Sequence, residues 1–176
     1  MTAWVVRPAP AAGELGGRLL AEYLDHVGRR WFLDRLGRPA TDRELAEALS
    51  ADALEDPAAG LTPPQGAFFV GWPGDDGQGE DGKEPGGCVG VRLLDAGTAE
   101  LKRLYVRPAA RRTGGGTALL GAAERWARES GAQRIVLDTR RDLGEAVALY
   151  RRAGFAEIPA YGSGPYREVW LGKELG

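Results

Sequence analysis

The chain has 176 residues, of which 43% are hydrophobic and 27% charged, a composition typical of one globular domain with a sizeable core. Its formal net charge of −2 excludes a strong electrostatic field for nucleic acid, and the chain lacks an apolar run long enough to span a membrane. The single cysteine, Cys88, excludes a disulfide framework, and the single histidine, His26, disfavours a histidine metal site or a Ser-His-Asp triad. We therefore expect one cytoplasmic domain over residues 1–176, without a metal.

The first third of the chain predicts a strand followed by two helices. Residues 4–6 (Trp-Val-Val) form a short apolar run typical of a strand. Apolar residues recur at helical spacing over residues 15–31, and the aromatic pair Trp31-Phe32 at the end of this helix either packs in the core or walls a binding pocket. The segment Thr41-Asp42-Arg43-Glu44 is a capping box, so a second helix begins there and ends before Pro57.

The middle of the chain predicts three strands, at residues 67–70, 88–94 and 99–106. The acidic segment 73–87 carries six glycines and buries little apolar surface, so we expect a flexible, dispensable loop between two antiparallel strands. Asp95-Ala96-Gly97 is a tight turn that folds the third strand back on the second.

The rest of the chain alternates helices and strands. The predicted elements are a helix from Gly114 to Gly131, a strand at 135–137, a helix that begins at Asp142 or Gly144 and ends at Gly154, and strands at 156–159 and 167–171. The continuous apolar run at 135–137 is typical of a central parallel strand. The fold class is therefore α/β (α+β), a single domain with a mixed, mostly antiparallel sheet of about seven strands flanked by about four helices.

The stretch that connects the strand at 99–106 to the next helix carries the strongest functional signal. It holds Arg111, Arg112 and the glycine run 114–116, and no acidic residue occurs from 101 to 116. Glycines let main-chain N–H groups approach a ligand, and a helix start offers unpaired N–H groups and a dipole that favours negative charge. The stretch therefore predicts a phosphate site, against the alternative of a flexible surface turn.

Two common phosphate motifs do not fit this stretch. A nucleotide-triphosphate loop needs a lysine after its last glycine, where Thr117 stands, and a dinucleotide fingerprint needs a further glycine where Leu119 stands. The residues Arg111, Gly114 and Gly116 instead match the pattern Gln/Arg-x-x-Gly-x-Gly/Ala. This pattern resembles the coenzyme-A pyrophosphate loop of the GNAT acetyltransferase superfamily.

The resemblance extends to both sides of the loop and covers roughly residues 88–176. Residues 100–108 look like the family's fourth strand, and residues 146–155 look like its last helix and the Gly-Phe pair that follows. The resemblance implies an acyltransferase that moves an acetyl group from acetyl-CoA to a primary amine by direct attack in a ternary complex. The acceptor would be a small-molecule or peptide amine, and no metal is implied.

The resemblance also implies two catalytic residues. Glu100 is the candidate base that removes a proton from the acceptor amine, directly or through water; the alternative is an ion-pair partner of Lys102 or Arg103. Tyr150 matches the family's tyrosine that protonates the leaving thiolate; the alternative is a core tyrosine with its hydroxyl at the rim.

The remaining candidate residues bind the substrates. The main chain of Leu104, Tyr105 and Val106 would hold the acetyl carbonyl and pantetheine arm, because the family's fourth and fifth strands splay apart there. The pyrophosphate would be held, mostly by main-chain groups, at Arg111, Arg112, Thr113, Gly114, Gly115, Gly116 and Thr117. Tyr161 and Tyr166 either line the acceptor site or cap the sheet edge. Many members of the family carry Gly where Arg112 stands and Asn where Leu143 stands.

A catalytically silent acyl-CoA-binding sensor module is the alternative function, and the presence of both Glu100 and Tyr150 favours the enzyme. We expect neither nucleic acid nor a membrane as a partner, and a homodimer is open because dimers are common in the family. The acceptor's identity does not follow, since the family acetylates small amines, antibiotics, amino acids and protein N-termini on one fold.

Overall fold

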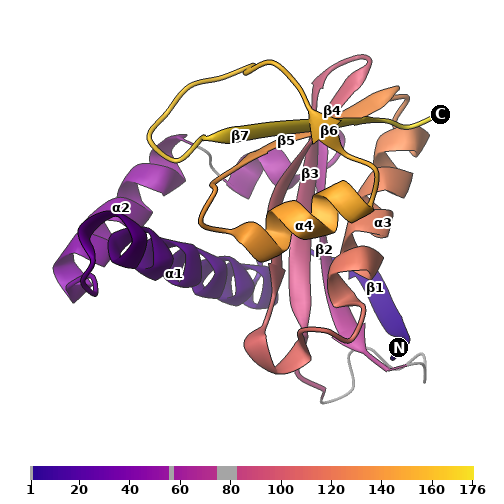
Figure 1. The fold of residues 1–176 in the computed structure, drawn as a ribbon. Coiled ribbons are helices and arrows are strands. Elements are labelled where there is room, and N and C mark those ends of the chain that lie inside the picture. Colours follow the sequence, from indigo (N-terminus) through magenta and orange to yellow (C-terminus); the bar gives the residue numbers. More distant parts are fainter. Residues whose placement is uncertain (1, 56–57, 75–82) are drawn as a thin grey trace.

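The computed structural model describes residues 2–55, 58–74 and 83–176 (Figure 1). In chain order the elements are β1 (Trp4–Pro8), α1 (Glu14–Leu36), α2 (Asp42–Glu55), the 3₁₀ helix η1 (Ala58–Leu61), β2 (Gly66–Pro73), β3 (Gly87–Asp95), β4 (Thr98–Val106), the 3₁₀ helix η2 (Pro108–Ala110), α3 (Gly115–Glu129), β5 (Arg134–Thr139), α4 (Gly144–Arg152), β6 (Ala156–Glu157) and β7 (Val169–Glu174). This order agrees with the prediction from sequence. The last two strands differ in extent, because β6 is shorter than predicted and β7 runs further toward the C-terminus.

The strands form one seven-stranded sheet in the order β1-β2-β3-β4-β5-β7-β6. Neighbouring strands are antiparallel except for β4 and β5, which are parallel, so the predicted mixed sheet is confirmed. The parallel pair is short, because residues 98–100 of β4 pair with 134–136 of β5 and the pairing then ends. Both strands continue beyond this point, to Val106 and Thr139, so they part in the middle of the sheet.

The half of β4 that does not pair with β5, residues 101–106, contains a bulge in its pairing with β3. Cys88 pairs with Tyr105 and Gly90 pairs with Lys102, so β4 has one more residue than β3 in this stretch. Arg103 lies in that stretch with a φ of 57°, in the left-handed region. A bulge bends a strand and increases its local twist, and this one lies where β4 has no β5 partner. The buried thiol of Cys88 donates to the main-chain oxygen of Arg103 at 3.7 Å, so this cysteine supports the bulge.

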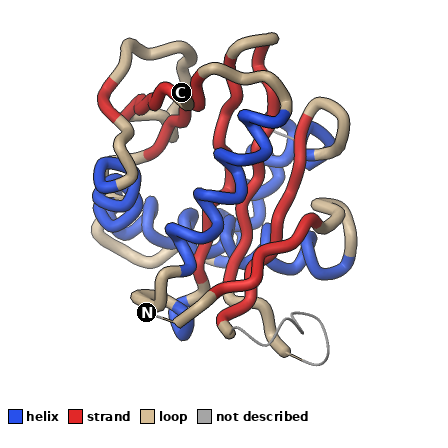
Figure 2. Tube along the Cα trace, turned by 90° about the vertical axis from the view of Figure 1, so that its right-hand side faces the viewer, coloured by secondary structure: helices blue, strands red, loops and turns tan. Residues whose placement is uncertain are grey.

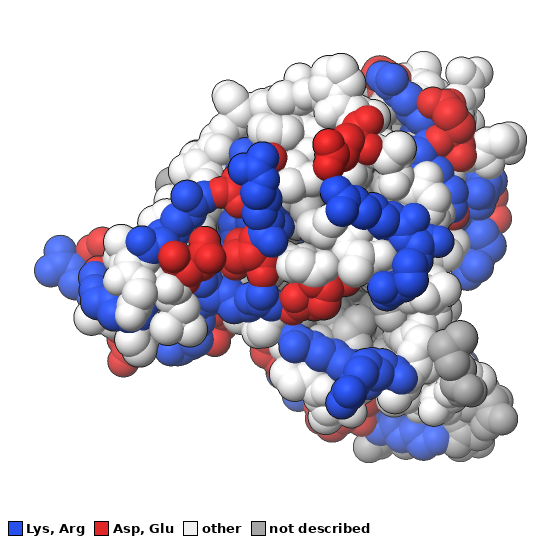
Figure 3. All heavy atoms as spheres, viewed as in Figure 1, with Lys and Arg blue, Asp and Glu red and all other residues white. Residues whose placement is uncertain are grey.

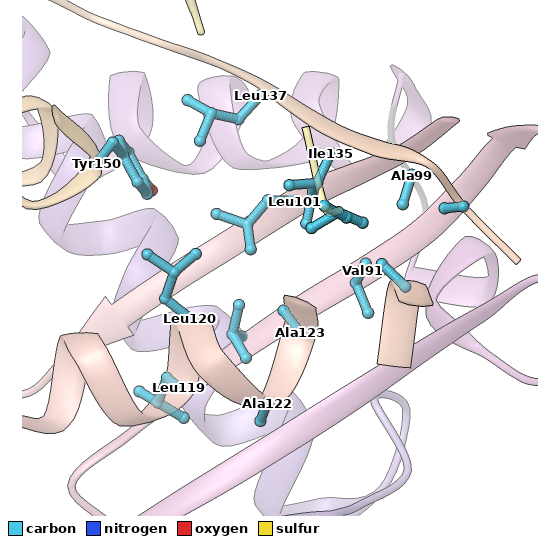
Figure 4. Close-up of a cluster of buried hydrophobic side chains, with 14 of the residues drawn as sticks. Val91, Ala99, Leu101, Leu119, Leu120, Ala122, Ala123, Ile135, Leu137 and Tyr150 are labelled. Carbon is cyan, nitrogen blue, oxygen red and sulfur yellow. The ribbon is translucent and has the colours of Figure 1, made fainter. Parts of the chain in front are cut away.

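Helices cover both faces of the sheet (Figure 2). The alternation of side chains along a strand sends successive residues to opposite faces, so each face has its own hydrophobic cluster. On one face, side chains of α3 pack against β3, β4 and β5 (Figure 4). The members of this cluster include Val91, Ala99, Leu101, Leu119, Leu120, Ala123, Ile135, Leu137 and Tyr150. The other face packs against α1, and its members include Leu19, Phe68, Val70, Cys88 and Tyr105. Burial of each large aliphatic side chain contributes about 1.5–3 kcal/mol.

Local signals fix the helix ends as predicted. At the start of α2 the main-chain N–H of Thr41 donates to Glu44 Oε2 at 2.9 Å, and the N–H of Glu44 donates to Thr41 Oγ1 at 3.2 Å, which is a complete capping box. Beyond α3, Gly131 adopts a φ of 88°, a conformation that stops the helix. Across the described ranges, none of the helices combines the length and the apolar character needed to cross a bilayer.

The acidic segment 73–87 joins β2 to β3, which pair as antiparallel strands as predicted. Residues 75–82 lie outside the described residues, so the flexibility and dispensability of this loop stay predictions. The described base of the loop is tied to the fold by Arg107. Its guanidinium donates to Glu22 of α1 at 2.6 and 2.8 Å, to Glu84 at 2.8 Å and to the main-chain oxygen of Pro85 at 2.9 Å.

Candidate active site

A cleft of about 700 Å³ opens beside the parting ends of β4 and β5. Residues 101–106 of β4 and 137–139 of β5 line it, and these lie beyond the last residues at which the two strands pair. The other walls come from α1, α2, the start of α3, α4 and residues 164–167 of the β6–β7 connection. The cleft therefore occupies the gap that the parting strands leave.

The first turn of α3 contributes main-chain N–H groups to the cleft. Its N-cap, Gly114, has a φ of 96°, a left-handed conformation that favours glycine, and it provides no side-chain cap. The N–H groups of Gly115, Gly116 and Thr117 precede the first helical hydrogen bond, which Ala118 donates to Gly114. The first turn has no acidic residue, and its dipole adds partial positive charge, so this helix start suits an anion.

Close packing also disfavours a side chain at two of the three glycines, most strongly at Gly115. The indole of Trp4 lies against Gly115, where an added Cβ would come within 2.3 Å of Cζ2. A Cβ on Gly116 would come within 2.8 Å of Cδ2 of Leu149 on α4. Thr113 holds Trp4 in place, because its hydroxyl accepts from Trp4 Nε1 at 3.0 Å and donates to a main-chain oxygen of η2 at 2.7 Å. Thr113 itself is not among the residues that line the cleft.

The two arginines of the loop behave differently. Arg111 is held at the cleft, because its Nε donates to the main-chain oxygen of Val106 at 3.2 Å and its Nη2 lies 3.2 Å from His26 Nε2. Burial, followed by the charge of Arg111, lowers the pKa of His26, so its uncharged ring accepts the hydrogen bond near neutral pH. Arg112 is exposed, and its main chain has a φ of 61°.

The three β4 residues predicted to bind the coenzyme all line the cleft. The side chains of Leu104 and Val106 pack against the core cluster of the α3 face, and that of Tyr105 is buried in the cluster of the α1 face. These residues therefore offer the cleft mainly the main chain of a strand edge that β5 does not pair. Such an edge suits hydrogen bonds to an extended ligand, and the binding role stays a prediction.

Tyr150 of α4 belongs to the core cluster of the α3 face (Figure 4), and it is also among the residues that line the cleft. The residue is 6% exposed, and its ring centroid is 5.8 Å from that of Phe155. Burial raises the pKa of its phenol, and the nearby Tyr23 and Asp138 raise it further. The hydroxyl is therefore protonated at neutral pH and available as a hydrogen-bond donor.

Glu100 lies behind the cleft wall rather than in it. Its side chain is 2% exposed, and its Oε2 accepts from Nε and Nη2 of Arg92 at 2.8 and 2.7 Å. Its Oε1 accepts from the hydroxyl of Tyr161 at 3.0 Å and lies 3.7 Å from Nζ of Lys102, which does line the cleft. Glu100 would therefore act on a ligand through Lys102 or through water, and its role as the base stays a prediction.

The two candidate acceptor-site tyrosines lie in different surroundings. Tyr161 bonds to Glu100 and does not line the cleft; burial, followed by the charge of Glu100, raises the pKa of its phenol. Tyr166 lines the cleft with its ring centroid 5.8 Å from that of Trp31, in a T-shaped contact. The ring centroids of Trp31 and Phe32 are 5.1 Å apart, and both residues also line the cleft. The aromatic pair of α1 is therefore part of a pocket wall, one of the two alternatives that the sequence left open.

A charged group in the cleft was missed by sequence reasoning. Asp138 lies at the end of β5, with Oδ2 at 4.0 Å from Lys102 Nζ and Oδ1 at 3.7 Å from Arg167 Nε. All three residues line the cleft. The side chains of Asp138 and Lys102 are each 12% exposed, and that of Arg167 is 28% exposed. The available signal was a carboxylate placed directly after the apolar run of a central strand.

The cleft is strongly basic although the whole chain is slightly acidic. Among the described residues that line it, the basic ones are Lys102, Arg103, Arg111, Arg112, Arg140, Arg152 and Arg167, and the acidic ones are Asp138 and Glu145. Basic side chains also gather over α4 and over the segment that leads into α3 (Figure 3). This excess of positive charge favours an anionic ligand.

Comparison with known proteins finds a matching family model and relatives that are named as acetyltransferases. The model of the acetyltransferase (GNAT) family matches residues 22–155. An uncharacterized N-acetyltransferase of Schizosaccharomyces pombe is 34% identical over 119 residues, which cover 67% of this chain and 69% of that relative.

Solved structures with the same fold cover nearly the whole chain. An acetyltransferase of the GNAT family from Staphylococcus aureus has a TM-score of 0.71 at 18% identity, with 99% of this chain and 100% of that chain covered. The PaiA N-acetyltransferase from Thermoplasma acidophilum, in complex with coenzyme A, has a TM-score of 0.64 at 19% identity, with 98% and 99% covered. At these identities the likeness establishes the fold.

Proposed function

Because the chain belongs to the acetyltransferase (GNAT) family, we propose that it transfers an acetyl group from acetyl-CoA to a primary amine while both are bound. The observation that carries this proposal is the arrangement of the cleft. A helix start that suits an anion lies on its wall, together with the main chain of β4 that β5 does not pair, with Tyr150 and with Asp138. These are the groups that acyl transfer from a phosphate-bearing thioester to an amine requires.

The start of α3 fits the diphosphate of the coenzyme. The N–H groups of Gly115, Gly116 and Thr117 precede the first helical hydrogen bond, the hydroxyl of Thr113 bonds to Trp4, and the cleft is basic. The relative from Thermoplasma acidophilum was solved with coenzyme A, which supports the same ligand class here. Most of the binding would come from main-chain groups, because Arg112 is exposed at the edge of the cleft and Arg111 is already held by Val106 and His26.

Acetyl-CoA would supply an activated thioester, so the protein needs to orient it and to manage protons. The unpaired main chain of residues 104–106 would donate hydrogen bonds to the acetyl carbonyl as negative charge develops on its oxygen. The closely packed walls formed by Leu149 and Tyr150 of α4 would keep water from that carbonyl.

The acceptor amine must lose a proton before it attacks, because a primary amine with a pKa of about 10.4 is mostly protonated at neutral pH. Two described carboxylates line the cleft, and Glu145 is paired with Arg30, so we assign the role of base to Asp138. Glu100 is the base that the sequence predicted; with its carboxylate bonded to Arg92 and Tyr161, it would act indirectly, by holding Lys102 beside Asp138.

Tyr150 would donate a hydrogen bond to the departing sulfur. The raised pKa of its phenol keeps the proton on Tyr150, and the ordinary thiol pKa of about 8.5 is lower than that of a phenol. Complete proton transfer from Tyr150 to the thiolate is therefore uphill. The hydrogen bond stabilises the leaving group by about 1–2 kcal/mol, and the proton that finally reaches the sulfur comes from the amine or from water.

The test is thiol release from acetyl-CoA, measured with a chromogenic thiol reagent and a panel of primary amines, together with calorimetric titration of coenzyme A. We expect saturable, amine-dependent release. Asp138→Asn should lower kcat/KM about 100-fold or more and remove the acidic limb of its pH profile, whereas Glu100→Gln should lower it less. Glu47→Gln, on the exposed face of α2, is the control and should behave like the wild type.

Two outcomes would contradict the proposal. Tight binding of acetyl-CoA with no turnover of any amine would favour the sensor module. Absence of coenzyme binding would remove the basis for either function. A larger loss of kcat/KM for Glu100→Gln than for Asp138→Asn would indicate that Glu100, and not Asp138, is the base.

A further inference from the structure

We propose that the acceptor is an α-amino acid with an apolar or aromatic side chain, whose carboxylate binds Arg167 and whose ammonium binds Asp138. This inference rests on the proposed function and names the substrate class of the same cleft. Three observations carry it: an adjacent cation and anion, an excess of positive charge, and an aromatic wall beside them.

The adjacent charges match the spacing within an α-amino acid. Arg167 Nε and Asp138 Oδ1 lie 3.7 Å apart, beyond hydrogen-bond distance, and both side chains line the cleft. An α-amino acid carries its ammonium and carboxylate on one carbon, so both groups can meet the pair at once. An amine without a neighbouring carboxylate would engage Asp138 alone and leave the guanidinium without a substrate partner.

The charge balance selects Arg167 as the carboxylate site. Lys102 Nζ lies between two carboxylates, 3.7 Å from Glu100 and 4.0 Å from Asp138. Among the described residues, Arg167 forms an ion pair with one carboxylate, Asp138, and its side chain is more exposed to solvent than that of Lys102, at 28% against 12%. Its guanidinium keeps its charge at any working pH and offers several N–H donors to a carboxylate.

The backbone of the β6–β7 connection positions Arg167. Its Nη1 lies 2.4 Å from the position that a Cβ on Gly162 would take, so the guanidinium rests directly on the main chain there. Gly164 has a φ of 148° and packs against the aliphatic part of the same side chain. The arginine is therefore held at the cleft by residues of its own loop.

An apolar wall lies in the same cleft. Tyr166 precedes Arg167 in the chain and contacts Trp31 edge to face, and Trp31 contacts Phe32. Leu49 of α2 also lines the cleft. An aromatic or aliphatic side chain of the acceptor would pack on this wall while its two charged groups meet Asp138 and Arg167.

The same lining disfavours polycationic acceptors. The described residues of the cleft include seven basic side chains and two acidic ones, so an aminoglycoside or a polyamine would bring further positive charge to a basic surface. Like charges brought together repel, and the repulsion is strongest where water is excluded. A zwitterion avoids this repulsion because it adds no net charge.

The experiment measures kcat/KM for thiol release with four matched amines: phenylalanine, phenylalaninamide, phenethylamine and the aminoglycoside kanamycin. We expect phenylalanine to exceed its amide and phenethylamine at least tenfold, and kanamycin to be the poorest acceptor. Arg167→Gln should make phenylalanine and its amide equal by raising the KM for phenylalanine, with the affinity for coenzyme A unchanged. Arg43→Gln, an exposed arginine of α2, should keep the wild-type preference.

The wild-type comparison decides the inference even if Arg167→Gln fails to fold, and Arg167→Lys, which keeps the charge, should retain part of the preference. Turnover of the amide or of kanamycin at or above the rate for phenylalanine would overturn the inference and leave the proposed function standing. Turnover of none of the four, with coenzyme bound, would overturn the inference, and the wider amine panel would then decide whether the proposed function stands.

Discussion

The packing of Trp4 on Gly115 predicts that Gly115→Ala destabilises the protein when Trp4 is present and does not when Trp4 is replaced by alanine. An alanine Cβ at Gly115 would lie 2.3, 2.5 and 2.7 Å from three atoms of the Trp4 ring, closer than real Cβ atoms approach other atoms. The ring is rigid and its Nε1 donates to Thr113 at 3.0 Å, so it cannot move aside without losing that bond. Overpacking of about 1–3 kcal/mol and a lost hydrogen bond of about 1 kcal/mol give a destabilisation of about 2–4 kcal/mol for Gly115→Ala.

The effect should reverse when Trp4 is removed. Gly115 is the first residue of α3, and its φ is outside the left-handed region, so the main chain accepts alanine there. In the Trp4→Ala background, Gly115→Ala should be neutral or should stabilise by up to about 1 kcal/mol, because alanine favours the helix over glycine. The coupling energy of the double-mutant cycle, which is the difference between these two effects, is then about 2–5 kcal/mol.

Urea unfolding of the four proteins, followed by far-UV circular dichroism, measures this cycle. Gly121→Ala is the matched control within α3, because its Cβ would contact only the end of Arg125 at 3.6 Å, and it should stabilise slightly in both backgrounds. An equal cost of Gly115→Ala with and without Trp4 would refute the packing argument and leave ligand approach as the reason for this glycine.

Three further predictions concern the coenzyme, the leaving group and pH. Arg112→Ala should weaken coenzyme A binding less than Gly116→Val, whose Cβ would press on Leu149. Calorimetric titration measures both affinities, and equal losses of affinity would contradict this prediction. Tyr150→Phe should lower kcat about tenfold with little change in KM, and a loss beyond about 1000-fold would contradict a hydrogen-bond role. Arg38, and then Thr41, lower the pKa of Glu44 from 4.5 to about 2, so the stability from this carboxylate is present above pH 4.5 and is lost as the pH falls toward 2. The difference in Tm between the wild type and Glu44→Gln should shrink over that range, and a constant difference would refute the assignment.

Sequence reasoning predicted the element order because the local signals are strong. Three of these signals act within a few residues: the capping box at residues 41–44, the helix stop at Gly131 and the apolar run at 135–137. They can therefore be interpreted without knowledge of the fold. The glycine loop was recognised for the same reason. The strand lengths were less predictable, since β6 and β7 extend only as far as their pairing with each other and with β5 allows.

The side chains of the cleft were harder to predict, because they depend on contacts between distant segments. Glu100 was expected to face a ligand, yet the register of β3 and β4 places Arg92 directly opposite it and the β6–β7 connection brings Tyr161 onto its carboxylate. Asp138 reaches the cleft only because β5 parts from β4. Likewise, a glycine run shows that Cβ atoms are absent, but the neighbours that require their absence, such as Trp4, become visible only in the fold.

The proposed function depends on main-chain N–H groups at the start of α3 that bind a diphosphate and so direct the thioester toward Tyr150 and Asp138. A crystal structure of the protein with bound coenzyme A is the most direct measurement of this arrangement. We expect diphosphate oxygens within hydrogen-bond distance of the N–H groups of residues 114–117, with the sulfur in the gap between β4 and β5. A coenzyme bound elsewhere, or density that leaves this helix start without a diphosphate, would contradict the account.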